Sequence, residues 1–509
     1  MRNRHSLLLG IAVSLAACGS DAGDPISATG ANSPRGGGGS GSGSDGNGVE
    51  GDGDGVVTGN GSVDGSSSGG APASPYTDFA INHVLVTGQS NSVANGGTPV
   101  LSTEQPYGNL MFDTGVMPAR GSKSAPNGVP CDGAGCVKYD VPSSFVPLVE
   151  GDLFFNYGVE TPASGLANEI AFLAQGHYKG KIPGLPDKHD VLVSLHGRSG
   201  NTYWCLRKNG CNYKPGYNHP FEQGMQEVES GKSLAAAAGK SYVVRAVAAI
   251  HGESDHYSYT AGVAELPLDG TDGTPGKIQT YADALVEWQH DYETSIRAIT
   301  QQSQPVPLFI SQISGWNDAK TSELAQHQLD AHLAAPGKVV LIGPAYAFAF
   351  ASDCRHYTNV GEKHLGEMFG KVYAKVVLEG RTWEPVRPRH VTRDGAEVTV
   401  QFHVPAPPLV IDTALVAEAA SYGFEYLDAA GAPKPIAKVE LAGPDAVRLT
   451  LAAVPTGAGR LTYAQNQTPL TCIGTPAGAR GNLRDSDATP SRSGLPLYDW
   501  AVHFDVAVP

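Results

Sequence analysis

The chain has 509 residues, 64 Gly and 36 Pro among them, and a formal net charge of −15. An acidic chain without basic clusters excludes nucleic acid and anionic membrane surfaces as expected partners. The glycines have no three-residue period, which excludes collagen. No run of about 18 apolar residues is present, which excludes a bundle of membrane-spanning helices.

The N-terminus, residues 1–18, is typical of a secretory signal. Arg2 and Arg4 precede the apolar stretch Leu7–Leu15, which is too short for a stable transmembrane helix. The stretch ends in Leu15-Ala16-Ala17-Cys18, which resembles the lipobox of bacterial lipoproteins. That resemblance implies an exported protein held at the membrane only by a lipid on the Cys. The residue after the Cys is not Asp, which by the family's rules favours the outer membrane. The alternative is an ordinary cleaved signal with a chance Cys.

The segment 19–75 has the composition of a disordered linker. It contains 19 Gly and 11 Ser among 57 positions, and almost no large apolar side chains. Such a chain cannot bury enough surface to offset the entropy of ordering its backbone. A flexible chain of this length spans roughly 40 Å, which gives reach to a folded domain tethered at its N-terminus.

Six cysteines remain after Cys18, and export to an oxidising compartment favours their pairing. Short separations suggest one disulfide between Cys131 and Cys136 and another between Cys205 and Cys211, and elimination then pairs Cys354 with Cys472. Six cysteines allow 15 pairings, so these three are hypotheses. No Cys-x-x-Cys or clustered His pattern predicts a zinc site, and we expect neither a metal nor a cofactor.

Residues 76–383 alternate between short apolar runs and helical patterns. This alternation predicts a doubly wound parallel sheet of five strands, with ligands bound at the carboxyl ends of the strands. The predicted strands are 83–87, 190–195, 242–250, 307–313 and 339–342. The predicted helices are 165–175, 221–238, 278–299, 322–334 and 360–378. The long insertion 103–160 is expected to be a loop that shapes a pocket.

From residue 384 to the C-terminus the pattern changes. The segments 397–404, 423–427 and 446–451 favour strands, with Pro and Gly at short intervals and no long helical pattern. This is typical of an all-β sandwich-like domain.

Two sets of polar residues follow predicted strands. Ser90 comes just after the first strand, where a Ser preceded by Gly is placed like a nucleophile and its own N–H can face an oxyanion. Asp353 precedes His356 by three residues after the fifth strand. A carboxylate at that spacing can accept the Nδ1–H of the imidazole and leave Nε2 as a base for the Ser.

Four blocks of sequence resemble those of the SGNH hydrolase superfamily, in its sialate O-acetylesterase-like carbohydrate esterase branch. They occur in the family's order over roughly residues 80–380, and each lies at the end of a predicted strand. The blocks are Gly88-Gln89-Ser90-Asn91, Gly197-Arg198-Ser199-Gly200-Asn201-Thr202, Ile250-His251-Gly252-Glu253-Ser254-Asp255 and Asp353-x-x-His356-x-Thr358-x-x-Gly361. The resemblance implies a three-layer α/β/α, flavodoxin-like domain.

The resemblance also implies roles. Ser90 would be the nucleophile, His356 the base and Asp353 its orienting partner. The backbone N–H groups of Ser90 and Gly200 would line the oxyanion hole. His251 stands where the family has a Gln that donates to the oxyanion, and an imidazole N–H can still donate one hydrogen bond.

Four further residues of these blocks are candidates for supporting a loop or contacting substrate: Gln89, Asn201, Glu253 and Asp255. The two carboxylates are expected to hold the loop by accepting backbone N–H bonds.

The expected function is hydrolysis of O-acyl esters on carbohydrate, acetyl esters first among them. One alternative is a lipase, polyesterase or acyltransferase with the same triad. Another is a glycan-binding surface lipoprotein without catalysis. The intact Ser90, Asp353 and His356 argue against that last reading. The oligomeric state is not predicted.

Overall fold

A computed structural model describes residues 76–117, 141–154, 157–210, 219–260, 262, 265–316, 321–466 and 478–509. All of them fall within one of the chain's two contact-defined units, Gly70–Pro509. Among these residues, no helix has the length and apolar character needed to cross a membrane. Several expectations concern residues outside the described ranges: the signal 1–18, the linker 19–75, Cys18, Cys131, Cys136, Cys211 and Cys472.

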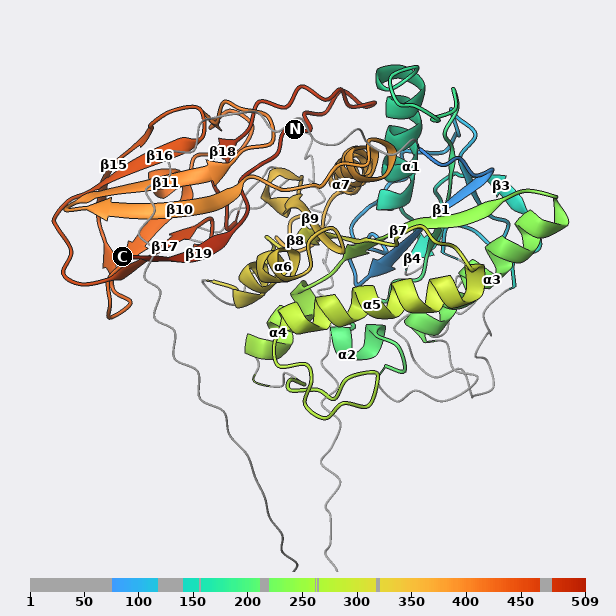
Figure 1. Ribbon diagram of the computed structural model, residues 1–509, viewed down its shortest axis with the longest axis horizontal. Helices are drawn as coiled ribbons and strands as arrows, with labels where there is room; N and C mark the ends of the chain where they lie inside the picture. Colours follow the sequence, from blue (N-terminus) through green and yellow to red (C-terminus); the bar gives the residue numbers. More distant parts are fainter. Residues whose placement is uncertain are drawn as a thin grey trace, which may run out of the picture. The chain divides into compact units, whose positions relative to one another are not determined.

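The central element is a seven-stranded sheet in the order β3-β2-β6-β1-β7-β8-β9 (Figure 1). Only β3 runs antiparallel to its neighbour, and the other pairs are parallel. Continuous burial of the strand residues on both faces explains their nearly uninterrupted apolar runs. The strands are β1 (Ile81–Gly88), β2 (Leu110–Phe112), β3 (Phe145–Pro147), β6 (Val191–Leu195), β7 (Tyr242–Ile250), β8 (Leu308–Gln312) and β9 (Val339–Pro344).

All five predicted strands are present, but the predicted total of five is wrong. They lie in the order β6-β1-β7-β8-β9, which is the 2-1-3-4-5 order of a flavodoxin-like sheet. The insertion 103–160 supplies the two extra strands, β2 and β3, at one edge. Each has three residues, too few to show a period in the sequence.

The five predicted helices are confirmed, and two short ones were not predicted. Thr161 caps α1, and Thr280 with Asp283 forms a capping box on α5. The confirmed helices are α1 (Pro162–Phe172), α3 (Pro220–Ala237), α5 (Tyr281–Thr300), α6 (Glu323–Ala334) and α7 (Asn359–Tyr373). One π turn extends α1 (η2, Leu173–His177) and another extends α7 (η4, Ala374–Leu378), and the unpredicted helices are α2 (Tyr203–Leu206) and α4 (Glu253–Thr260).

Helices cover both faces of the sheet. Along β1, Leu85 belongs to the core under α3, α5 and α6, whereas Val84 and Val86 belong to the core under α1 and α7. This alternation follows from the two-residue period of a strand. The expected helix–sheet–helix layering is therefore present.

The helices α1 and α7 approach each other closely because glycines line their contact. A Cβ at Gly366 would lie 2.2 Å from the carbonyl oxygen of Pro162, and one at Gly165 would lie 2.4 Å from that of Lys363. The contact fixes α7, whose first turn directly follows the segment that carries His356.

After α7 the chain forms antiparallel sheets. Two have four strands, in the orders β10-β11-β16-β15 and β14-β13-β17-β19, and β12 pairs with β18. Alternate burial along β11 gives it one face toward the core. The strands are β10 (Arg387–Asp394), β11 (Glu397–His403), β12 (Val410–Ile411), β13 (Phe424–Leu427), β14 (Pro433–Lys434), β15 (Ile436–Leu441), β16 (Ala446–Leu451), β17 (Gly459–Tyr463), β18 (Leu483–Arg484) and β19 (Phe504–Val508). Three short elements remain: a hairpin of β4 (Leu153–Phe154) and β5 (Tyr157–Gly158), and the 3-10 turns η3 (Ala345–Ala347) and η5 (Ala420–Gly423).

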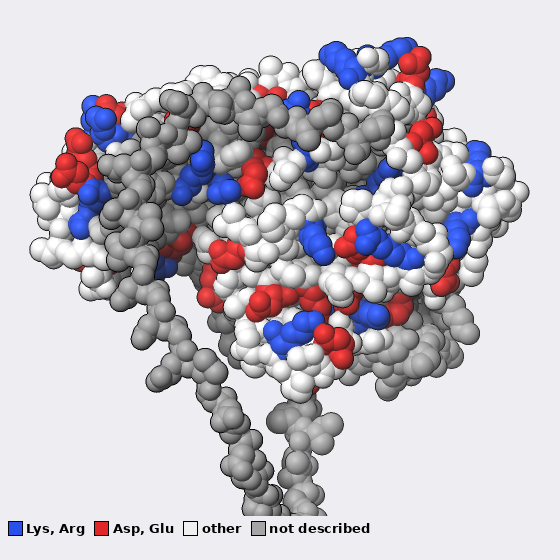
Figure 2. Space-filling view, in the orientation of Figure 1, with Lys and Arg blue, Asp and Glu red and all other residues white. Residues whose placement is uncertain are grey.

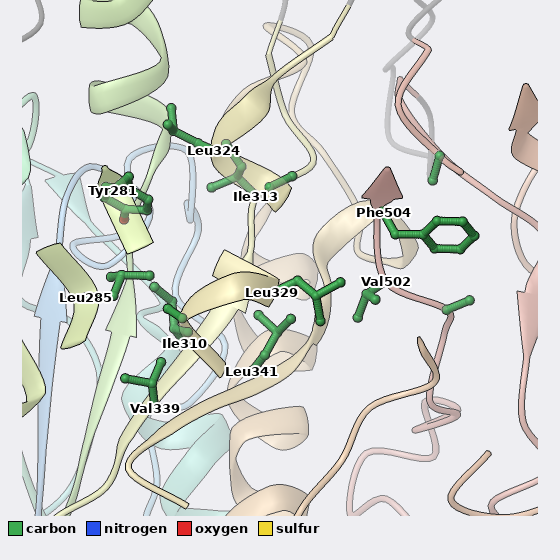
Figure 3. Close-up of a cluster of buried hydrophobic side chains, with 14 of the residues drawn as sticks. Tyr281, Leu285, Ile310, Ile313, Leu324, Leu329, Val339, Leu341, Val502 and Phe504 are labelled. Carbon is green, nitrogen blue, oxygen red and sulfur yellow. The ribbon is translucent and has the colours of Figure 1, made fainter. Parts of the chain in front are cut away.

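The segment before β19 packs against the parallel sheet. Figure 3 shows Val502 beside Leu329 of α6, in a core that also contains Leu341 of β9. The backbone of His503 exchanges two hydrogen bonds with the Gln312 side chain at the end of β8, at 2.8 and 3.0 Å. These contacts join the two parts of the described chain, and the domain boundary at residue 384 stays a prediction.

Candidate active site

Ser90 lies in the turn that follows β1, the middle strand of the sheet. The N–H of Gln89 donates to the carbonyl of Ile250 at 3.1 Å, which holds the turn beside the end of β7. Gly88 has a φ of +132°, and a Cβ there would lie 2.0 Å from the Ile250 oxygen, so only glycine fits. The turn presents Ser90, 7 % exposed, at the carboxyl edge of the sheet.

Asp353 and His356 lie between η3 and α7. The Nε2 atom of His356 is 2.9 Å from Ser90 Oγ, and its Nδ1 atom is 2.5 Å from an oxygen of Asp353. The other carboxylate oxygen of Asp353 accepts the backbone N–H of Arg355 at 3.1 Å and that of His356 at 3.0 Å. The three side chains thus form a hydroxyl–imidazole–carboxylate relay.

The charge state of Asp353 suits this arrangement. Burial acts to raise the pKa of the carboxyl. The hydrogen bond from the His356 ring and the charge that this ring can carry outweigh it and lower the pKa to about 2. An ionised Asp353 accepts the Nδ1–H and leaves Nε2 as the acceptor for the Ser90 proton.

Helix α7 fixes the position of His356. The Thr358 side chain accepts the N–H of Gly361 at 3.2 Å and so caps the helix. The His356 carbonyl accepts the N–H of Ala351 at 2.7 Å, which closes the loop that carries both relay residues. The Thr and Gly of the last sequence block therefore have structural roles here.

A second loop reaches the same edge from β6. The N–H of Arg198 donates to the Gly88 carbonyl at 2.8 Å, which brings this loop against the end of β1. Gly200 is exposed, with a φ of +76°. Within the described ranges, no backbone hydrogen bond engages the N–H of Ser90 or of Gly200. Their assignment to an oxyanion hole stays a prediction.

His251 is fully buried, and both of its ring nitrogens have partners. Nδ1 lies 2.7 Å from the Tyr281 hydroxyl, while Nε2 lies 3.2 Å from the Asn201 carbonyl and 3.3 Å from Asp255. Burial lowers the pKa of His251 to about 4, so the ring is neutral at pH 7. In this geometry the ring supports the loop that carries Gly200, and its role as an oxyanion donor stays a prediction.

The carboxylates of the third block hold their neighbours in place. Glu253 accepts the side-chain amides of Gln89 at 2.9 Å and Asn91 at 3.1 Å, and burial raises its pKa to about 7. Gln89 in turn accepts the N–H of Ser254 at 2.7 Å. Asp255 accepts the N–H of Tyr203 at 3.0 Å. Glu253 therefore supports the turn that carries Ser90, and Asp255 supports the start of α2.

Sequence reasoning gave no role to Asn95 or Arg355 at this site, and it left Tyr257 open between lining a substrate cleft and supporting a loop. Asn95 places its amide nitrogen 3.3 Å from His356 Nε2. Arg355 donates to the Tyr257 hydroxyl at 2.8 Å, with its guanidinium 4.0 Å from the centre of that ring. Asn95 lies only five residues after Ser90, but nothing in the sequence reveals the pairing of residues 257 and 355, 98 positions apart.

The described ranges contain one group of carboxylates close enough together to hold a metal ion, namely Asp485, Asp487 and Asp499. The Lys371 ammonium lies against it, 2.8 Å from Asp499 and 3.0 Å from Asp487. The cluster is thus an internal ion-pair network remote from Ser90 in the sequence. The three disulfide pairings stay predictions, because each includes at least one Cys outside the described ranges.

No protein-family profile matches the sequence, and no curated protein matches it. Among solved structures, a carbohydrate acetylesterase from Xanthomonas citri is 13 % identical with a TM-score of 0.48, over 84 % of this chain and 80 % of that one. A protein from Arabidopsis thaliana is 14 % identical with a TM-score of 0.33, over 58 % and 98 % of the two chains. A carbohydrate acetylesterase from Sinorhizobium meliloti is 10 % identical with a TM-score of 0.26, also over 58 % and 98 %. All three TM-scores lie below 0.5.

Proposed function

We propose that this protein is a serine ester hydrolase that removes O-acyl groups from carbohydrate. The observation that carries the proposal is the relay at the carboxyl edge of the sheet, with Ser90 Oγ 2.9 Å from His356 Nε2 and His356 Nδ1 2.5 Å from Asp353. A Ser hydroxyl is a poor nucleophile at neutral pH unless a base takes its proton, and this geometry supplies the base.

Acylation follows from these positions. Ser90 Oγ bonds to the ester carbonyl carbon while His356 Nε2 takes the hydroxyl proton. The tetrahedral oxyanion is stabilised by the N–H groups of Ser90 and Gly200, each worth about 2.7–4 kcal/mol in comparable sites. The bond from the carbonyl carbon to the sugar oxygen then breaks, and His356 returns its proton to that oxygen. The products are the free sugar hydroxyl and acyl-Ser90.

Deacylation repeats the same steps with water. His356 takes a proton as the water oxygen bonds to the acyl carbon, and the second tetrahedral intermediate collapses. Ser90 Oγ leaves and receives the proton from His356, and the carboxylic acid is released. Asp353 keeps its charge throughout and orients the ring.

The substrate class and the location rest on sequence. The four blocks that resemble the sialate O-acetylesterase-like branch support acetyl as the acyl group and carbohydrate as the alcohol. The lipobox-like segment ending in Cys18 supports a lipid-anchored enzyme with its substrate outside the cytoplasm.

The test is acetate release from acetylated oligosaccharides by the purified protein and by Ser90→Ala, with 4-nitrophenyl esters of increasing chain length alongside. We expect release by the wild type, none by the variant, and a preference for acetyl over long acyl chains. A preference for 4-nitrophenyl palmitate would favour a lipase. Equal release by Ser90→Ala would contradict the proposed chemistry.

A further inference from the structure

The side-chain amide of Asn95 contacts the nitrogen of His356 that would carry the proton during catalysis. Its Nδ2 atom lies 3.3 Å from His356 Nε2, the same nitrogen that lies 2.9 Å from Ser90 Oγ. A neutral imidazole accepts hydrogen bonds through one lone pair only. The Ser90 hydroxyl is the nearer donor to that lone pair, so the contact from Asn95 is the longer and weaker of the two.

The backbone turns Asn95 toward this nitrogen. Its N–H donates to the Ser90 carbonyl at 2.9 Å, which closes the turn after the nucleophile. The preceding residue, Ala94, is fully buried and has a φ of +56°. That conformation costs a residue other than glycine about 1–3 kcal/mol. The next residue, Gly96, lies so close to the loop of His356 that a Cβ there would be 3.3 Å from His356 Cβ. Asn95 is therefore held between a strained residue and a close backbone contact.

Asn95 differs from an asparagine that only holds the fold together. Asn91 is fully buried, and its amide donates to Glu253 at 3.1 Å and to the Arg355 carbonyl at 3.2 Å. Asn95 is half-buried, and among the described residues its side chain has a hydrogen-bond contact only with His356. An amide has two N–H donors and one acceptor oxygen. Asn95 thus keeps donor capacity for a molecule that enters from solvent.

The leaving oxygen of the ester must come to the same nitrogen. In the proposed acylation step, the bond from the carbonyl carbon to the alcohol oxygen breaks, and that oxygen takes the proton from His356 Nε2. An oxygen within hydrogen-bond reach of Nε2, on the side of Asn95, lies about 3 Å from the Asn95 amide nitrogen. The amide N–H can then donate to the negative charge that develops on this oxygen, while Asn95 itself transfers no proton.

We propose that Asn95 binds the oxygen that exchanges a proton with His356. This is the leaving alcohol oxygen in acylation and the attacking water in deacylation, since the two occupy the same place. The inference rests on the proposed function. It adds a donor on the leaving-group side of the ester, separate from the donors that face the oxyanion. Alkyl esters such as O-acyl sugars gain most from this donor, because their leaving oxygen carries the most concentrated charge.

The test compares four acetate esters whose leaving groups differ in acidity, namely 4-nitrophenyl, phenyl, trifluoroethyl and ethyl acetate. A 4-nitrophenolate leaves as a stable anion, whereas ethoxide, like a sugar alkoxide, needs a proton. Asn95→Ala should lower kcat/KM at least about tenfold more for ethyl acetate than for 4-nitrophenyl acetate. Asn95→Asp keeps the shape of the side chain without its N–H donors, so it should show the same selective loss. All four esters are uncharged, which keeps attraction to the acidic and basic side chains interspersed over the face in Figure 2 out of the comparison.

The matched control is Asn359→Ala. The Asn359 amide donates to the Pro99 carbonyl at 2.6 Å, so it supports the segment that follows Asn95, and its own hydrogen bonds in the described structure do not involve His356. This variant should leave the ratio of the four rates unchanged. Thermal unfolding checks the fold of each variant. Labelling with a fluorophosphonate checks the nucleophile, because that reaction needs the base but releases fluoride, and it should proceed in Asn95→Ala at nearly the wild-type rate.

Two results would overturn the inference while leaving the proposed function intact. Equal losses for all four esters in the Asn95 variants would give Asn95 a purely structural role, and the absence of any loss would remove it from the mechanism. A wild-type protein that hydrolyses none of these esters, and whose Ser90 takes no fluorophosphonate, would instead overturn the proposed function and the inference with it.

Discussion

Two regions of the molecule place a basic side chain against aspartates, and only one of them also brings a hydroxyl group to the basic side chain. His356 lies between Asp353 and the Ser90 hydroxyl, and its side chain is 12 % exposed. Lys371 on α7 is fully buried against Asp487 and Asp499 and donates to the Leu497 carbonyl at 2.6 Å. The same kinds of charge therefore serve two different purposes.

The two regions differ in whether their basic group can accept a proton at neutral pH. At the first region Nε2 of His356 lies 2.9 Å from the Ser90 hydroxyl, the group from which we propose that it takes a proton, and the His356 side chain is partly open to solvent. At the second, burial acts to lower the pKa of Lys371, but the carboxylates of Asp499 and Asp487 outweigh burial and raise it. A lysine that stays charged between aspartates cannot act as a base at neutral pH. It joins α7 to the C-terminal segment instead.

The largest expected effect is the loss of the base. His356→Ala should lower kcat/KM for an acetyl ester by about 10⁵-fold or more, as in comparable triads. The measurement is steady-state turnover of 4-nitrophenyl acetate, with thermal unfolding as the control for folding. A loss of less than tenfold in a folded variant would remove His356 from the mechanism.

The second largest loss of turnover is expected when Asp353, the carboxylate that orients His356, loses its charge. Asp353→Asn should lower kcat/KM by about 10³–10⁴-fold, because the neutral amide no longer fixes the tautomer of the ring.

Since the pKa of Asp353 is about 2, its ionised form should contribute stability above about pH 4 and lose it as the pH falls toward 2. Chemical denaturation from pH 2 to 6 should show this loss in the wild type. Identical curves for the variant would contradict the pairing.

At the second region, around Lys371, a substitution should lower stability and leave turnover nearly unchanged. Lys371→Met leaves the buried aspartates without their cation and should lower the free energy of unfolding by about 3–5 kcal/mol. Turnover per folded molecule should stay within a few-fold of the wild type, because Lys371 has no contact with the relay. Denaturant unfolding and turnover on the same sample check both statements. A hundredfold loss of turnover with unchanged stability would reverse the comparison.

The smallest effect concerns Glu253, whose pKa is raised to about 7 by burial. A raised carboxyl pKa means that the folded state binds more protons than the unfolded chain between about pH 4.5 and 7. The free energy of unfolding should therefore fall across that window, by up to about 3 kcal/mol. Glu253→Gln should lack this component. Parallel stability curves for the two proteins from pH 4.5 to 8 would show that Glu253 does not titrate there.

Much of the fold was predictable because it depends on local patterns. The strands around Ser90 and before Asp353 are apolar runs bounded by polar turns, and the Asp–His spacing lies within one loop. The relay was predictable for the same reason, since each half follows a predicted strand. The edge strands β2 and β3 were not, because three residues carry no period.

The remaining features depend on contacts between distant positions. His251 could be identified as a departure from the resembled block, but its bonds to Tyr281 and the Asn201 carbonyl require the folded chain. The N–H of Asp505 donates to the Gln326 side chain on α6 at 2.8 Å, a contact between residues 179 positions apart. In the sequence Lys371 has the pattern of an ordinary helical lysine. Its ion pairs with Asp487 and Asp499 exist only because α7 packs against the C-terminal segment of the folded chain.

The most direct test of the account is covalent labelling of the folded protein with a fluorophosphonate, followed by mass spectrometry of its peptides. We expect one modified residue, Ser90, and labelling that slows strongly in His356→Ala but proceeds normally in Lys371→Met. Labelling at another residue, or no labelling of a protein that hydrolyses acetyl esters, would contradict it.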